Sequence, residues 1–191
     1  MIMSFLPTDY KEPVTDKYMK LTEGENTFRI LSSAIVGYEY WKEITKSDGT
    51  RGRTPIRKRL NEKIDMNDLE VKEDGTLDTP KVFWAFVVYN WDADAIQILE
   101  VTQASIRKAI KALVDNKKWG DQSQYNICIS RSGKGKETEY QTNPEPKEEM
   151  PTEILEQYKS MHIDLEQLFI GGDPFALANE DKDFDDVLDT K

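Results

Sequence analysis

Aromatic and cationic side chains are interleaved between residues 38 and 63. Tyr38, Tyr40 and Trp41 come first, and residues 42–63 then carry eight Lys or Arg against three Asp or Glu. Single-stranded nucleic acid is bound by such a mixture, because cations contact its phosphates and exposed rings stack on its unpaired bases. We therefore expect a single-strand-binding site that includes Tyr38, Tyr40, Trp41, Lys42, Arg51, Arg53, Arg57, Lys58 and Arg59.

The same residues also fit an ordinary strand whose aromatic side chains are core and whose charges are solvated. In a strand, successive side chains point to opposite faces, so Tyr38 and Tyr40 are expected on one face and Trp41 on the other. The long basic stretch beside the aromatic residues and the acidic C-terminus favour a binding site over this alternative.

Two other segments extend the expected site. Trp91 falls in a turn, where no core requires it, so we expect it to be exposed and to make a contact. Residues 133–136 (GKGK) form the tip of an expected hairpin, and Lys134, Lys136 and the nearby Arg131 suit a loop that contacts phosphates. A merely flexible turn would have the same composition.

Signatures of catalysis and metal binding are weak. Residues 133–138 lack the spacing of a phosphate-binding loop, and the carboxylate pair Asp92 and Asp94 is typical of a turn. His162 and Cys128 are the only histidine and the only cysteine, which excludes an internal disulfide and a zinc site built from cysteines. We expect no enzyme activity, no cofactor and no metal.

The hydrophobic pattern predicts mainly strands. Residues 25–41 form one long strand, bent at Ser32-Ser33 or at Gly37, and residues 53–60 form a basic strand. Residues 81–90 are apolar on both faces, which predicts a central strand, with Trp84 and Phe86 in the core. The alternative for these two side chains is the lining of a binding groove. A tight turn leads from there into a strand over residues 95–101.

The second half of the chain alternates between helix and hairpin. Apolar residues recur with helical spacing from Ile106 to Val114, with Thr102 or Ser105 as the expected cap. A hairpin over 125–130 and 137–141 follows, then a linker over 143–151, and then a helix over 153–169. This order predicts a mainly β fold with flanking helices, an OB-fold type partly open five-stranded barrel. An α+β sandwich would give much the same order.

Charge divides the chain into parts. Its formal net charge is −10, yet residues 1–144 balance 22 basic against 22 acidic residues, so the imbalance lies in residues 145–191. We expect an N-terminal arm over 1–23, a nucleic-acid-binding domain over 24–145, a linker and helix over 146–175, and a disordered acidic tail over 176–191. No apolar run reaches the ~20 residues that span a bilayer, and the first residues do not read as a secretory signal.

Several segments resemble a group of bacteriophage single-stranded-DNA-binding proteins. They are residues 18–32 (YMKLTEGENTFRILS), 82–90 (VFWAFVVYN), 96–103 (IQILEVTQ), and 119–121 (WGD) followed by 125–127 (YNI). The similarity extends over roughly residues 18–145. It implies an OB-fold, sequence-independent binding of single-stranded DNA, and a place in phage DNA replication, recombination or repair in the cytoplasm of an infected bacterium.

The resemblance also gives the tail a role. Acidic tails of such proteins recruit phage or host replication and recombination proteins, which here assigns partner contacts to Phe184, Asp185, Asp186, Val187 and Leu188. The bacterial form ends in acidic residues and a terminal Pro-Phe, a feature this chain lacks, and zinc-containing phage relatives have Cys and His ligands that it also lacks.

Two alternatives to this function stay open. In the first, the acidic segment binds a basic enzyme, as a DNA mimic does, and the barrel is only a scaffold. The excess of five positive charges over residues 42–63 argues against it, because a mimic does not need them. In the second, the ligand is RNA, bound as cold-shock domains bind it.

Overall fold

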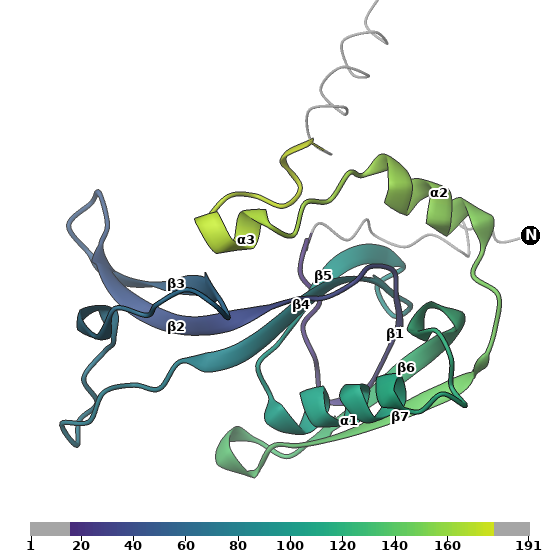
Figure 1. The fold of residues 1–191 in the computed structure, drawn as a ribbon, viewed down its shortest axis with the longest axis horizontal. Helices are drawn as coiled ribbons and strands as arrows, with labels where there is room; N and C mark the ends of the chain where they lie inside the picture. Colours follow the sequence, from purple (N-terminus) through teal and green to yellow (C-terminus); the bar gives the residue numbers. More distant parts are fainter. Residues whose placement is uncertain (1–15, 178–191) are drawn as a thin grey trace, which may run out of the picture.

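The computed structural model describes residues 16–177 (Figure 1). Within them, seven strands form one antiparallel, bent sheet in the order β3-β2-β4-β1-β6-β7, with β5 paired to the other edge of β4. The strands are β1 (Gly24–Ile30), β2 (Ile35–Thr45), β3 (Arg51–Arg59), β4 (Lys81–Asn90), β5 (Ala95–Val101), β6 (Tyr125–Ser132) and β7 (Glu139–Lys147). The helices are α1 (Ala104–Asp115), α2 (Thr152–Ser160) and α3 (Gln167–Ile170), with 3-10 turns η1 (Met66–Asp68), η2 (Gln122–Gln124) and η3 (Gly135–Glu137).

The expected long first strand is divided into β1 and β2, which follow the same edge of β4 one after the other. The division falls at residues 31–34. Leu31 N donates to Val87 O, and Val87 N in turn donates to Ser32 Oγ, each at 2.9 Å. The serine hydroxyl thus stands in for a backbone carbonyl while the chain bends, which places the bend at the first of the two expected positions.

The structure confirms a mainly β fold with flanking helices and a barrel-like sheet. Its path is compatible with the OB type, because β6 returns to pair with β1 and α1 lies between β5 and β6. The sheet has seven strands rather than the five of the expected barrel, since six strands were expected along the chain and the first of them is divided into β1 and β2. In the described part of the chain β5 and β7 are not paired, so the barrel stays open.

The β2–β3 hairpin projects beyond the rest of the sheet (Figure 1). We call this hairpin, with the following loop over residues 60–80, the wing. Both hairpin strands are long enough to project, since they pair from Gly37 opposite Arg59 out to Thr45 opposite Arg51. Pro55 is tolerated in β3 because β3 is an edge strand.

β4 separates two apolar cores, as expected for a central strand. Its inner face places Phe86 and Val88 against Ile106 and Ile110 of α1, with Trp84 partly buried beside them. Its outer face carries Phe83, Ala85, Val87 and Tyr89, which pack with β5 against side chains of the C-terminal segment, among them Leu165, Leu168 and Phe175. The region expected as linker and helix is therefore part of the packed body.

The described part of the N-terminal arm also packs on the sheet. Ile98 N donates to Lys17 O at 3.0 Å, and Met19 N donates to Ile98 O at 2.9 Å. These bonds form a short parallel bridge along the edge of β5 that β4 leaves unpaired. Met19 is 5% exposed and belongs to the inner core. Residues 16–21 thus cover a strand edge, a role that the polar composition of the arm did not predict.

Three local predictions were wrong. The N-cap of α1 is Gln103 rather than Thr102 or Ser105, and it makes no side-chain cap bond. β7 continues to Lys147, so the linker expected over 143–151 is a strand in its first half; Pro144 and Pro146 are tolerated because β7 is an edge strand.

The third concerns the C-terminal helix. The helix expected over 153–169 is broken between α2 and α3, and His162 at the break has a left-handed φ of 46°.

Within residues 16–177, no helix combines the length and the apolar character needed to cross a membrane.

Candidate nucleic-acid interface

The strand register divides the expected site between two faces of the wing. Tyr38 lies opposite Lys58 and Tyr40 opposite Ile56, whereas Trp41 lies opposite Pro55. Residues opposed in a pair point to the same side, so one face carries Tyr38, Tyr40, Lys42 and Lys58, and the other carries Trp41, Arg51, Arg53, Arg57 and Arg59. The alternation expected for Tyr38, Tyr40 and Trp41 is confirmed. We call these the tyrosine face and the tryptophan face.

The loop of the wing closes the tyrosine face. Tyr40 is 2% exposed and its hydroxyl donates to Asp68 Oδ2 at 3.5 Å. Lys42 pairs with the same carboxylate, which lowers the pKa of Asp68 and raises that of Lys42. Tyr40 was expected in the binding site, but its ring is enclosed and offers no free face to a base, as in the alternative in which the aromatic side chains are core. Tyr38 and Lys58 are half-buried.

The tryptophan face presents an open aromatic ring. Trp41 is 41% exposed, and the guanidinium of Arg53 lies 5.8 Å from its ring centroid. Arg53 is held by a two-point contact with Glu70, of which the bond from Nε to Oε1 measures 2.8 Å. Arg51 is exposed at the outer end of the same face. A cation and an accessible ring thus stand side by side, as stacking on a base beside a phosphate requires.

Arg57 has a different environment from its neighbours. Its guanidinium lies 2.9 Å from carboxylate oxygens of both Glu39 and Glu100, and its side chain is only 12% exposed. Burial raises the pKa of Glu100, an effect that Arg57 opposes. Arg57 therefore pairs with two partly buried carboxylates where the wing meets β5, an environment that indicates a role in stability and leaves little of its side chain exposed for a phosphate.

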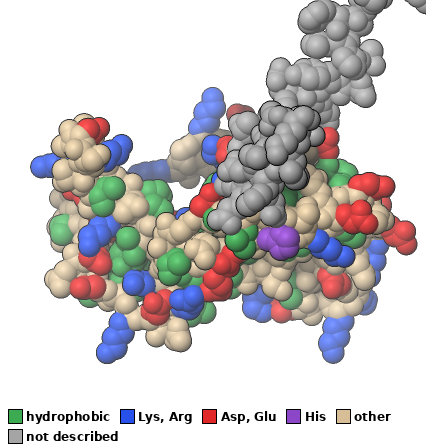
Figure 2. All heavy atoms as spheres, turned by 90° about the horizontal axis from the view of Figure 1, so that it is seen from above, with side chains coloured by type: hydrophobic (Ala, Val, Ile, Leu, Met, Phe, Trp, Pro, Cys, Tyr) green, Lys and Arg blue, Asp and Glu red, His purple; other side chains and the backbone are tan. Residues whose placement is uncertain are grey.

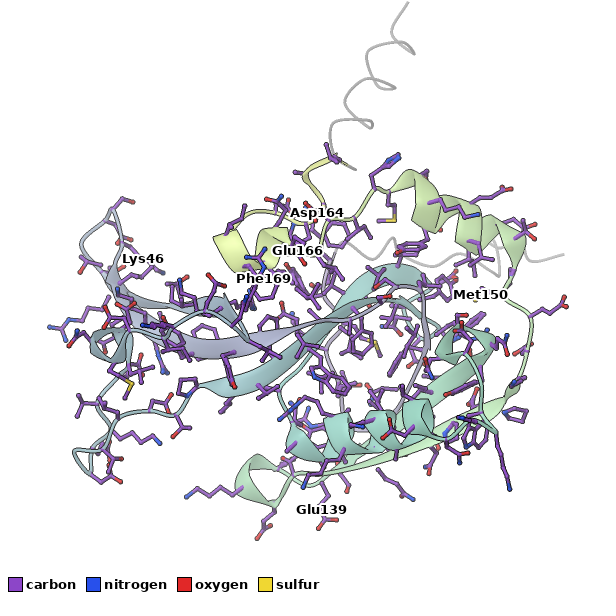
Figure 3. All side chains as sticks on the ribbon, viewed as in Figure 1. Lys46, Glu139, Met150, Asp164, Glu166 and Phe169 are labelled. Carbon is purple, nitrogen blue, oxygen red and sulfur yellow. The ribbon has the colours of Figure 1, made fainter. Side chains whose placement is uncertain are left out.

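Arg59 lies at the base of the wing, where the C-terminal segment crosses the tryptophan face. Its Nη2 lies 2.6 Å from Glu166 Oε2, and its guanidinium lies 4.6 Å from the ring centroid of Phe169 (Figure 3). Glu166 and Phe169 belong to the region of α3. Sequence reasoning missed both, because no local pattern indicates that a residue 107 positions away will meet Arg59.

Trp91 is packed instead of exposed. Its ring meets Tyr89 edge-on at 4.8 Å between centroids, and its Nε1 donates to Asn126 Oδ1 at 3.0 Å. It also packs against the outer core. The prediction of an exposed contact residue was therefore wrong: the turn folds back, so that a residue outside the strand still reaches the core.

The β6–β7 tip carries two exposed lysines, Lys134 and Lys136. Gly133 has a φ of +78°, and a Cβ there would lie 2.2 Å from Glu137 O, so the turn requires glycine. Arg131 does not reach the tip, because its Nη1 donates to Leu21 O at 2.7 Å beside β1. The tip lies at the same end of the molecule as the wing (Figure 1), as the ligand-binding loops of an OB-type barrel do.

Seen from above, the wing end shows basic, acidic and hydrophobic side chains interspersed (Figure 2). Its exposed apolar residues include Trp41, Ile44 and Leu60. Within residues 16–177, no cluster of His, Cys, Asp or Glu is arranged to hold a metal ion. The expected partner residues Phe184, Asp185, Asp186, Val187 and Leu188 lie outside the described residues.

Comparison with protein-family models, with curated proteins and with solved structures finds no match to this chain.

Proposed function

We propose that this protein binds single-stranded DNA without sequence preference, through the tryptophan face of the wing and the lysines of the β6–β7 tip. The observation that carries the proposal is the exposed ring of Trp41 with Arg53 beside it. A ring face accepts any base, because every base has a π surface, and the cations act on phosphates, which are the same in every nucleotide.

The carboxylates beside the arginines are compatible with binding. The contacts of Arg53 with Glu70 and of Arg59 with Glu166 involve side chains that are about half exposed on the arginine side. Exposed ion pairs contribute only ~0–1 kcal/mol, so a phosphate can replace them at little cost. In the free protein, these carboxylates hold the long arginine side chains on the tryptophan face, which lowers the conformational entropy that the arginines lose when DNA binds.

The biological setting follows from the resemblance to phage proteins. We place the protein in phage DNA replication, recombination or repair in the cytoplasm of an infected bacterium, with the acidic C-terminus recruiting replication or recombination proteins. The alternative, an acidic module that binds a basic enzyme, requires no nucleic-acid contact at the wing.

A titration tests the function directly. Oligo(dT), oligo(U) and duplex DNA are added to the protein at two salt concentrations while tryptophan fluorescence and the anisotropy of a labelled oligonucleotide are recorded. We expect oligo(dT) to bind and to quench the fluorescence, duplex DNA to bind less tightly, and a Trp41→Phe variant to lose most of the quenching. Absence of oligo(dT) binding at low salt would reject the proposal, and tighter binding of oligo(U) would make the ligand RNA.

A further inference from the structure

The last part of the described chain crosses the base of the wing. We call residues 161–177 the strap. Its hydrophobic residues Leu165, Leu168 and Phe175 are each at most 8% exposed and pack in the outer core, which fixes the strap on β4 and β5. Between these anchors, α3 turns Glu166 and Phe169 toward the wing (Figure 3). They are three positions apart, a spacing that places both side chains on one side of a helical turn.

Phe169 occupies a slot of three walls. A Cβ at Gly37 would come within 2.8 Å of Phe169 Cε1 and 2.9 Å of Phe83 Cε1, so the bare glycine backbone allows the ring to approach β2. Phe83 meets Phe169 edge-on at 5.8 Å between centroids. Arg59 lies over the ring and holds Glu166 at the same time. The slot thus receives a flat ring, and its arginine receives an anion.

A nucleotide presents the same two groups, a flat base and an anionic phosphate. Arg59 and Trp41 both lie on the tryptophan face. Arg59 lies opposite Gly37, so the slot and Trp41 are four residues apart along β2, or about 13 Å. A single strand that stacks on Trp41 and runs along β2 toward the barrel therefore reaches the slot.

We propose that the slot formed by Gly37, Phe83 and Arg59 is a second nucleotide subsite, which Glu166 and Phe169 occupy in the free protein as an internal substitute for phosphate and base. The proposal rests on the proposed function. The exchange is local: the side chain of Glu166 is 55% exposed, and α3 spans only four residues, whereas Leu165 and Phe175, the anchors on either side of α3, stay buried. DNA then binds with the strap still on the sheet but with the α3 turn displaced from Arg59.

The first test compares two variants of equal charge. Glu166→Gln removes the anion from Arg59, whereas Glu156→Gln removes an exposed carboxylate on α2, elsewhere in the C-terminal region. We expect Glu166→Gln to bind oligo(dT) about two- to fivefold more tightly than the wild type, as the loss of one exposed ion pair allows. Glu156→Gln should match the wild type. Equal affinities for the two variants would overturn the subsite.

The second test asks whether the gain acts through Arg59. In an Arg59→Ala background, Glu166→Gln should bring no further increase in oligo(dT) affinity, because the cation that Glu166 pairs with is gone. In the wild type, hydrogen exchange of amides 167–172 should become faster when oligo(dT) is added at saturation, since the α3 turn leaves the slot. Unchanged or slower exchange there, in a protein that binds oligo(dT), would reject the displacement.

The outcomes separate the two proposals. If the wild type does not bind oligo(dT), the proposed function fails and the subsite fails with it. If the wild type binds but the two glutamine variants behave alike, only the assignment of the slot is wrong. A thermal unfolding curve for each variant shows whether a change in its oligo(dT) affinity is accompanied by a loss of stability relative to the wild type.

Discussion

Trp41 and Trp84 differ in environment, since Trp41 is exposed on the wing and Trp84 packs against the inner core. Trp41 is 41% exposed on the wing, and its ring contacts Arg53 rather than a core. We expect Trp41→Ala to weaken oligo(dT) binding by ~1–3 kcal/mol, the range found for base stacking, with little change in the free energy of unfolding. Anisotropy titration and urea denaturation measure the two quantities. A variant that binds like the wild type would remove Trp41 from the site.

Trp84 provides the contrasting prediction. It is partly buried against the inner core on β4, so its removal leaves a cavity between the sheet and α1. We expect Trp84→Ala to lower the free energy of unfolding by ~3 kcal/mol or more, while the folded fraction still binds oligo(dT). Trp84→Phe, which keeps most of the volume, is the matched control. Loss of binding in a normally stable Trp84→Ala protein would instead place a ligand on the inner face.

Tyr89 gives a pH-dependent prediction. Burial, together with the hydrogen bond that its hydroxyl donates to Asp94, raises the pKa of Tyr89 from 10.0 to about 12. Because the pKa is higher in the folded than in the unfolded state, the stabilisation is present below pH 10 and is lost as the pH rises through 12. Phenolate absorbance is titrated in the wild type and in Tyr89→Phe, and the difference between the two curves should contain one phenol that ionises near pH 12. If the difference titrates near pH 10, Tyr89 is not held in this way.

For single residues, the sequence predicted the direction of a side chain better than its exposure. Alternation placed Tyr38 and Trp41 on opposite faces correctly, because it follows from strand geometry alone. Exposure depends on what covers a face. Tyr40 is enclosed by a loop that brings Asp68 over it, and Trp91 is covered by a turn that brings it to Asn126. Neither partner is near in sequence, so neither was predictable.

The wing as an element contains two kinds of basic residue. Arg57 is nearly buried between Glu39 and Glu100, whereas Lys58, on the tyrosine face, makes no ion pair among those found within residues 16–177. Removal of Arg57 leaves two partly buried carboxylates, with side chains 11% and 26% exposed, without their counter-ion. We expect Arg57→Ala to destabilise the protein by ~3 kcal/mol. We expect Lys58→Ala to leave stability nearly unchanged. Urea denaturation measures both, and equal stabilities would show that the Glu39–Arg57–Glu100 cluster contributes nothing net.

Elements with strong local patterns were predictable. The bounds of β4 and β5 coincide with the expected strands because a long apolar run and a tight turn determine them locally. The divided first strand, the continuation of β7 through two prolines and the broken C-terminal helix all depend on tertiary contacts. The bend at Ser32 is the clearest case, because its hydroxyl accepts a hydrogen bond from Val87 N on β4, a strand that is distant in sequence. The same reason explains why the strap was expected only as a linker and a helix.

For the whole molecule, binding should depend on salt and not on sequence. Neutralising phosphates releases counter-ions, so log K against log salt concentration should fall with a slope of about −0.7 per phosphate contacted on a single strand. Replacing Lys134 and Lys136 at the tip together with alanine should make that slope shallower, by about 1.4 if both contact phosphate. Mixed-sequence oligonucleotides should show the same change as oligo(dT). An unaltered slope would place the phosphate path away from the tip.

The acidic C-terminus gives the last prediction. Residues 178–191 hold six acidic and two basic residues, a net charge of −4 in a chain whose net charge is −10. If the proposed function holds, we expect this polyanionic segment to compete with DNA phosphates for the cations of the wing. We expect a protein truncated after residue 177 to bind oligo(dT) more tightly at low salt. The gain should shrink toward physiological salt, where the Debye length falls to about 8 Å. Full-length protein with those six acids changed to Asn or Gln is the control, and it should match the truncation if charge is the cause. If the truncation brings no gain at low salt, competition is excluded, and recruitment through Phe184, Val187 and Leu188 stays the proposed role of this segment.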